Sequence, residues 1–258
     1  MKPLTKFIAA FDLHYGYERV GGHKVPLHDI KAINCMLAVA RDFKPDVFII
    51  GGDGIDAGCV SHHNHGKPGT TEGLKLIEDA TEGRKAFIEP IEKIVGKGKL
   101  VYVCGNHERF LTDLTDKIPS LEGLLDIKTL LKLDKWTVIP QGKAYNLGKL
   151  TFIHGDQLSG GENVAKAAVT SYERSVRFGH YHTFSVASKN SALDYKNGKT
   201  GIAVPCLCSK NPKYGKGSPN KWMQGFVMGY VEKSGNFSDS IAIILDGKCI
   251  VNGKVYKG

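Results

Sequence analysis

The chain has 258 residues, a length that suits one large domain with a fully buried core. Hydrophobic residues make up 41% and charged residues 24%, and no apolar run approaches the ~20 residues that cross a membrane. The formal net charge is +9. The apolar stretch near the N-terminus, Phe7 to Phe11, is too short for a signal peptide, so we expect a cytoplasmic protein.

The first expected elements alternate between strand and helix. Short apolar runs predict strands, and apolar residues spaced three or four apart predict helices. In chain order these are a strand at Lys6–Phe11, a helix at His28–Phe43, a strand at Val47–Ile50, a helix at Gly73–Val95 with a break near Pro90, and a strand at Lys99–Cys104. This order implies parallel strands with helices covering the sheet.

The middle of the chain predicts a helical insertion followed by shorter elements. The expected elements are a helix at Leu111–Leu133, strands at Trp136–Pro140 and Leu150–His154, a helix at Gly161–Tyr172 and a strand at Val176–Phe178. We expect this pattern to end near residue 184, which would make residues 1–184 the core part of the domain.

Beyond His182 the pattern changes to strands joined by Gly, Asn and Asp turns. The expected strands are Gly201–Cys208, Met223–Glu232, Ser240–Leu245 and Lys248–Tyr256. They predict a second, mostly antiparallel sheet packed onto the first. The fold class is therefore α/β with two sheets, in a single domain over residues 1–258 whose mostly β extension covers 185–258.

Six cysteines do not indicate disulfides or a structural zinc site. None has the C-x-x-C spacing of such a site, and most lie in apolar runs. We expect small buried side chains at all six, which are Cys35, Cys59, Cys104, Cys206, Cys208 and Cys249.

Five short blocks at strand-to-loop junctions carry the chemistry. Each follows an apolar or β-branched run and supplies at least one Asp, Asn or His. They are Asp12-Leu13-His14, Gly52-Asp53-Gly54-Ile55-Asp56, Gly105-Asn106-His107-Glu108, His154-Gly155-Asp156 and Gly179-His180-Tyr181-His182. An α/β scaffold gathers oxygen and imidazole ligands from distant chain positions in this way, so the series predicts a metal centre.

The residue types suggest how such a centre would be built. Asp53 suits a bridging carboxylate, because it follows a buried strand and two glycines that permit close backbone approach. Asp12 and His14 are two apart and would point to the same side of an extended segment, as would His180 and His182. Asn106 can ligate through its amide oxygen.

His107 would face away from this ligand set if the backbone is extended. A histidine there can protonate a leaving oxygen when a carboxylate holds its other nitrogen. Glu108 and Asp156 are the nearest candidates for that carboxylate. Asp56 is expected to order the turn of its block or to bond a ligand, rather than to bind metal.

The ordered series D-x-H, G-D-x-x-D, G-N-H-E, H-G-D and G-H-x-H resembles the calcineurin-like metallophosphoesterase superfamily, over residues ~6–184. The resemblance implies a two-sheet β-sandwich flanked by helices, with two divalent ions and His107 as the acid. Manganese is the leading expectation, and iron, nickel or zinc remain alternatives. One metal would take Asp12, His14, Asp53 and His182, and the other Asp53, Asn106, His154 and His180.

Departures from the family patterns narrow the expectation. Ser/Thr protein phosphatases of the superfamily extend the second block to G-D-x-V-D-R-G, whereas Ala57 stands here in place of that arginine. The chain therefore looks closer to Mre11/SbcD-type nucleases and phosphodiesterases, although Glu108 replaces the Asp usual in those nucleases. Arg109 could contact phosphate or form a structural salt bridge, and His62 and His63 could contact substrate or simply be solvated.

The tail supplies the argument about substrate. From Thr183 to Gly258 there are eleven Lys and no Arg against four acidic residues, which favours a polyanionic partner. Lys210–Lys221, followed by Trp222, could track a phosphate backbone or form a long turn. We therefore expect a nucleic-acid phosphodiesterase, with a phosphomonoesterase or small-nucleotide phosphodiesterase as the alternative.

An inactive binding module is disfavoured, because every expected ligand is present. The sequence leaves the oligomeric state open, a homodimer included, and predicts no membrane partner.

Overall fold

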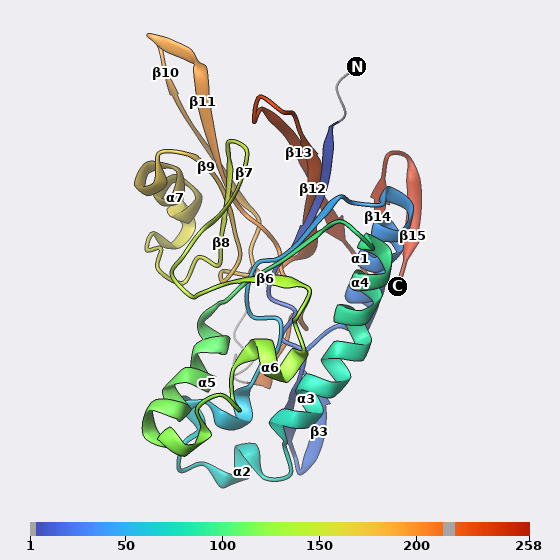
Figure 1. Cartoon of the computed structure of the whole chain (residues 1–258), viewed down its shortest axis with the longest axis vertical. Coiled ribbons are helices and arrows are strands. Elements are labelled where there is room, and N and C mark those ends of the chain that lie inside the picture. Colours follow the sequence, from blue (N-terminus) through green and yellow to red (C-terminus); the bar gives the residue numbers. More distant parts are fainter. Residues whose placement is uncertain (1–3, 214–219) are drawn as a thin grey trace.

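The computed structural model describes residues 4–213 and 220–258. Within them, two sheets pack face to face and helices cover their outer sides, so the expected mixed α/β architecture with flanking helices is confirmed (Figure 1). Part of the basic segment that precedes Trp222, residues 214–219, lies outside the described residues. No helix in the described ranges is both long and apolar enough to cross a membrane.

The first sheet has six strands in the order β13-β12-β1-β4-β5-β6. Its parallel centre matches the predicted order and comprises β1 (Thr5–Ala10), β4 (Val47–Ile50), β5 (Lys99–Val103) and β6 (Trp136–Ile139). Two antiparallel strands extend it, β12 (Gln224–Val231) and β13 (Phe237–Ile244). Every residue of β4 is buried, as its uninterrupted apolar run requires of a strand covered on both faces.

The second sheet has five strands in the order β10-β11-β9-β8-β7. They are β7 (Tyr145–Leu147), β8 (Leu150–Ile153), β9 (Ser175–Phe178), β10 (Ser185–Ser191) and β11 (Asp194–Ala203). Phe7 of the first sheet meets Phe152 of the second at a ring separation of 5.6 Å, within an apolar layer that both sheets share. Burial of this layer holds the two sheets together.

Helices complete the outer layers. The helices are α1 (Ile30–Phe43), α2 (Pro68–Thr71), α3 (Leu76–Gly83), α4 (Glu89–Val95), α5 (Asn106–Lys117), α6 (Ile127–Leu131) and α7 (Val164–Tyr172). Helix α7 packs against β9, β10 and β11, while Figure 1 shows α1 and α4 on the other side of the molecule. Two hairpins lie apart from the large sheets, β2 (Tyr17–Val20) with β3 (His23–Pro26), and β14 (Lys248–Val251) with β15 (Lys254–Lys257).

Of two helical expectations, one is refined and the other needs correction. The expected break near Pro90 takes the form of a π-helical turn at Arg84–Ile88, which interrupts the α-helix between α3 and α4, and Pro90 lies in the first turn of α4. Proline is tolerated there, and π-turns relieve the clash it causes inside a regular helix. The long insertion expected from Leu111 is instead two separate helices, of which α5 already begins at Asn106.

The sequence predicted that the tail forms the second sheet by itself, and this prediction is wrong, because the tail strands divide between the two sheets. β12 and β13 join the first sheet beside β1, whereas β10 and β11 join the second beside β9. The expected strand Gly201–Cys208 ends early, at Ala203, and only isolated bridges follow. Alternating hydrophobicity shows which side of a strand is buried, but it does not show which strand lies next to it.

Candidate metal centre

Seven predicted ligands gather where strands of both sheets end, and five of them are buried there: Asp12, His14, Asp53, His154 and His182. β1, β4 and β5 run parallel to one another, as do β8 and β9, so the carboxyl ends within each group lie together. The contributions are Asp12 and His14 after β1, Asp53 after β4, Asn106 after β5, His154 after β8, and His180 and His182 after β9.

One half of the cluster combines Asp12, His14 and His182 with Asp53. His14 Nε2 lies 3.2 Å from His182 Nε2 and 3.7 Å from Asp53 Oδ2. His182 Nε2 lies 3.5 Å from Asp12 Oδ1. These are the four residues that the family resemblance assigns to one metal.

The other half combines Asn106, His154 and His180 with the same Asp53. His154 Nε2 lies 3.1 Å from Asp53 Oδ2 and 3.0 Å from Asn106 Oδ1. His180 Nδ1 lies 2.9 Å from the same amide oxygen. Asp53 Oδ2 therefore faces both halves, which is the position that a bridging carboxylate needs.

The ligand backbone is left-handed rather than extended, which corrects the expectation for both D-x-H and H-x-H. The φ angles are 52° at Asp12, 44° at His14, 50° at Asp53, 67° at His180 and 56° at His182. Residues other than glycine rarely adopt this conformation, and such strain gathers at functional sites. Sharp local turns, and not the period of a strand, bring the paired ligands to one side.

Two glycines allow the strand ends to approach this closely. A Cβ atom on Gly52 would lie 2.3 Å from His154 Nδ1, and one on Gly105 would lie 2.3 Å from Asp53 Oδ1. Both distances are far below van der Waals contact, so neither position has room for a side chain. The close backbone approach expected beside Asp53 is thus present.

The donor set fits divalent cations. Asp12 Oδ1 is buried and has no hydrogen-bond partner among the described residues, and an unpaired carboxylate oxygen is costly to bury. Two imidazole nitrogens face each other in the first half, and at most one of them can donate to the other. Asp53, His154 and His180 offer ligand atoms within 4.8 Å of one another, as do His14, Asp53 and His107. Carboxylate, amide oxygen and imidazole together suit manganese, iron, nickel or zinc.

The charges of the cluster are strongly coupled. Burial opposes ionisation of Asp53, but the imidazoles of His154 and His107 hold the pKa of this carboxyl well below its usual range. Burial likewise opposes the charged form of His154, yet Asp53 and then Asp12 outweigh it and raise the pKa of His154 to about 10. Without a metal, a proton on His154 therefore balances the carboxylates.

Asp56 holds His107, in place of the carboxylates expected from the sequence. His107 lies in the first turn of α5 rather than on extended backbone, and its Nδ1 lies 2.6 Å from the carbonyl oxygen of Asp56. Since a carbonyl only accepts, Nδ1 carries the hydrogen. The Asp56 carboxylate also lies 3.1 Å from His14 Nδ1 and accepts from the backbone N–H of Gly58 at 3.1 Å. One residue thus orients two histidines and orders its own turn.

Glu108 and Asp156 accept hydrogen bonds from groups other than His107, so the prediction that either carboxylate holds His107 is wrong. Glu108 is buried and accepts from the backbone N–H groups of Asp53 at 3.0 Å and Gly105 at 2.6 Å, which ties the ends of β4 and β5 together. Asp156 accepts from Gln141 Nε2 at 2.6 Å.

A cavity of about 370 Å³ opens over the centre. Its lining combines residues of the ligand blocks with residues of the loop that follows the second block, and with Phe110 and Trp222. They are His14, Asp53, Asp56, Asn106, His107, His180, His182, Gly58, Ser61, His63, Asn64, Phe110 and Trp222. The centre is therefore accessible to a ligand of modest size.

Of the three predicted substrate contacts, one lines the cavity and two do not. His63 lines the cavity, whereas His62 does not. The Nδ1 atom of His62 lies 3.8 Å from Asp113 Oδ2. Arg109 does not line it either, because its guanidinium turns to Asp113 at 3.2 Å, one helical turn further along α5. The structure thus favours the structural reading of Arg109.

Sequence reasoning missed several neighbours of the centre, among them Ser61, Asn64 and Phe110 in the cavity lining and a cysteine beside His182. Cys208, expected as a plain buried side chain, is buried but places its Sγ 3.8 Å from His182 Nδ1. It also forms a group with His14 and His182 whose ligand atoms lie within 4.8 Å of one another. No motif marks Cys208, which reaches the site through a segment after β11.

No family model and no curated protein sequence matches the chain. Among solved structures, Vps29 of Chaetomium thermophilum is similar at 10% identity and a TM-score of 0.40, covering 93% of this chain and 97% of that one. TT1561 of Thermus thermophilus is similar at 9% identity and a TM-score of 0.34, covering 92% of this chain and 99% of that one.

Proposed function

We propose that the protein is a metal-dependent phosphoester hydrolase of the calcineurin-like metallophosphoesterase type. The observation that carries the proposal is the pair of ligand sets that share Asp53 Oδ2, one with His14 and the other with His154. When bound, two divalent cations would activate water and neutralise charge on the phosphoryl oxygens. Manganese is our leading candidate for both positions.

His107 is the proposed general acid. Its Nδ1–H donates a hydrogen bond to the Asp56 carbonyl, so Nε2 is the nitrogen that can exchange a proton at the cavity. As an imidazolium, His107 would give its Nε2 proton to the leaving oxygen and return to the neutral ring with Nδ1 still protonated. The packing of His107 against Phe110, at a ring separation of 4.8 Å, limits its rotation.

The substrate we propose first is a nucleic-acid phosphodiester, on the strength of the lysine excess in the tail. A second candidate, a small phosphodiester, is supported by the cavity itself. Among the described residues that line it there is no Lys or Arg, and its volume of about 370 Å³ suits a small ligand.

The deciding experiment is a substrate panel with manganese-loaded protein. It compares single-stranded DNA, duplex DNA, a chromogenic phosphodiester and a chromogenic phosphomonoester. We expect hydrolysis of the chromogenic diester whether the natural substrate is nucleic acid or a small phosphodiester. If it is nucleic acid, we also expect DNA cleavage that weakens steeply as the salt concentration rises. An Asp53→Asn variant is the control and should lose both metal and activity. Metal-loaded protein that cleaves none of the four would refute the proposal.

A further inference from the structure

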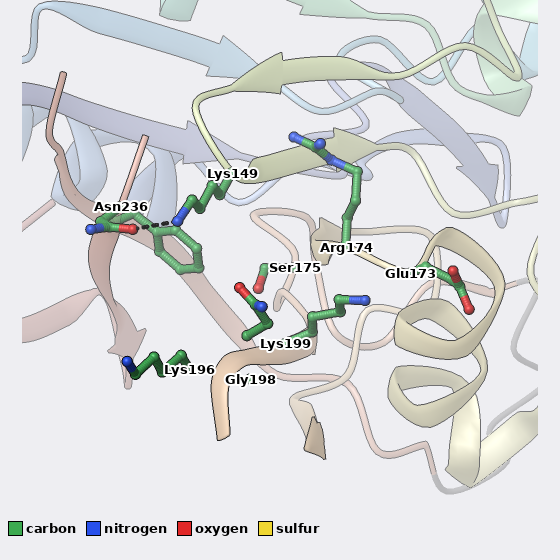
Figure 2. Close-up of a pocket in the computed structure, with 10 residues that line it drawn as sticks. Lys149, Glu173, Arg174, Ser175, Lys196, Gly198, Lys199 and Asn236 are labelled. Carbon is green, nitrogen blue, oxygen red and sulfur yellow. Dashed lines mark hydrogen bonds between the residues drawn. The ribbon is translucent and has the colours of Figure 1, made fainter. Parts of the chain in front are cut away.

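A second cavity, of about 650 Å³, lies away from the metal centre (Figure 2). Its walls come from the turn between β7 and β8, the start of β9, the middle of β11 and the turn between β12 and β13. The lining residues are Lys149, Glu173, Arg174, Ser175, Lys196, Asn197, Gly198, Lys199, Asn236 and Phe237.

This cavity sits at the opposite ends of the strands that carry the metal ligands. Lys149 precedes β8, whose other end leads to His154, and Arg174 precedes β9, whose other end leads to His180. Lys149 and His154 flank β8 and are five positions apart, so at about 3.3 Å per strand residue they are roughly 16 Å apart. A ligand in this cavity would therefore leave the metal centre open.

The charge around the cavity is unbalanced. Lys149, Arg174, Lys196 and Lys199 face one acidic residue, Glu173, among the described lining residues. Glu173 in turn lies 3.8 Å from Lys189, a cation outside the lining. Convergence of like charges is unfavourable unless an anion lies between them.

Two of the cations are held in place by neutral partners, so their charge is not cancelled. Lys149 Nζ donates to Asn236 Oδ1 at 2.7 Å, as the dashed line in Figure 2 shows. Arg174 donates from Nε to Thr151 Oγ1 at 2.8 Å and from Nη2 to the carbonyl of Gly148 at 2.9 Å. These bonds reduce the entropy that the two side chains would lose on binding a ligand.

Asp239, two positions after the lining residue Phe237, is already neutralised by an arginine. Arg177, which is fully buried, donates to both oxygens of Asp239 at 2.5 and 2.9 Å. The Phe237 ring, at the edge of the cavity, lies over the same guanidinium at 5.5 Å. Asp239 therefore does not compete with a ligand for the lysines.

We propose that this cavity binds an oligophosphate, an anion of two or three linked phosphoryl groups. Lysine binds phosphate as a point charge and arginine as a fork, and Ser175, Asn197 and Asn236 supply further polar groups. Four cations exceed the need of a single phosphate ion. Phe237 is the one aromatic residue among the described lining and is already occupied by Arg177, so the lining offers no stacking platform for a base. The site is independent of the function proposed for the metal centre.

Calorimetric titration with inorganic triphosphate tests the site, with the full chain in EDTA so that no divalent cation bridges the ligand to the metal centre. We expect the Lys196→Gln/Lys199→Gln variant, and separately Lys149→Gln, to weaken binding about tenfold or more. The matched control is Lys85→Gln/Lys117→Gln, which removes two exposed lysines elsewhere and should change affinity less than about twofold. Unchanged thermal unfolding shows that each variant is folded.

Further ligands identify the recognised group. ATP should bind as tightly as triphosphate, adenosine should not bind, and orthophosphate should bind far more weakly. Equal losses in the cavity and control variants would overturn the proposal, as would orthophosphate binding as tight as triphosphate. ATP binding much tighter than triphosphate would show nucleoside recognition and also overturn it. Single-stranded DNA that binds where triphosphate does not would replace it with a nucleic-acid surface.

Discussion

Asp56 governs the orientation of two histidines through different atoms. Its carboxylate bonds His14, a proposed metal ligand, while its backbone carbonyl bonds His107, the proposed acid. The sequence could supply the ligand types, because Asp and His carry their chemistry in the side chain. It could not supply the partner of His107, because every residue has a carbonyl. The sequence also did not predict the left-handed backbone at Asp12 and Asp53, because an aspartate adopts that conformation only occasionally.

Replacement of His107 by alanine should separate metal binding from turnover. We expect kcat for a chromogenic phosphodiester to fall by about 10²–10⁴, the usual worth of a positioned acid. Metal content, measured by elemental analysis of the purified variant, should not change. His62→Ala is the control, since His62 is a nearby histidine outside the cavity lining, and it should retain most of kcat. A His107→Ala enzyme of near-normal kcat would exclude the acid role.

The order of the elements was readable where the chain alternates between strand and helix. The apolar runs at β1, β4 and β5 predicted a parallel core because each is followed by a helix long enough to cross back. The tail strands carried no such constraint, so their division between two sheets could not be foreseen. Its result is that β13 and β9, from different sheets, meet through Asp239 and Arg177.

This ion pair links the two sheets and gives a stability prediction. Asp239→Leu would leave the Arg177 charge buried and unpaired, and should lower the free energy of unfolding by about 3–5 kcal/mol. The double variant Arg177→Met/Asp239→Leu removes both charges and should recover most of that loss. Urea denaturation of the three proteins measures the difference. A double variant no more stable than Asp239→Leu would show that the contribution comes from packing and not from charge.

At the scale of the whole molecule, we expect metal binding to be coupled to the release of a proton from the protein. The pKa of His154 is raised to about 10, above its ordinary value of 6.5, so the metal-free fold is stabilised fully below pH 6.5 and loses that stabilisation as pH rises through 10. Metal requires the neutral ring and takes over the role of the proton. Metal binding near pH 8 should therefore release a proton from His154, which calorimetry in buffers of different ionisation enthalpy detects.

The same linkage predicts stability. Manganese at about 100 times its dissociation constant should stabilise the fold by about 2.7 kcal/mol. The difference in Tm between loaded and metal-free protein should widen from pH 6.5 to pH 9, and it should stay flat in a His154→Gln variant. A difference that narrows with pH in the parent protein would contradict the assignment of His154 as a ligand.

At this scale, the sequence indicated the charge of the tail but not where the charge would lie. Lys196 and Lys199 join Lys149 and Arg174 only because β11 pairs beside β9. Other tail lysines form separate pairs, such as Lys254 with Asp42. Among the described residues, no lysine of the tail lines the metal cavity itself.

The edge-on contact between Trp222 and His182, with ring centres 4.2 Å apart, gives the molecule an optical property. The chain has two tryptophans, and the other, Trp136, is buried and bonded to Glu92. Light emitted by Trp222 arises within contact distance of a proposed ligand, while Trp136 contributes a steady background. We therefore expect occupancy of the centre to change the fluorescence of the unlabelled protein through the contact of Trp222 with His182.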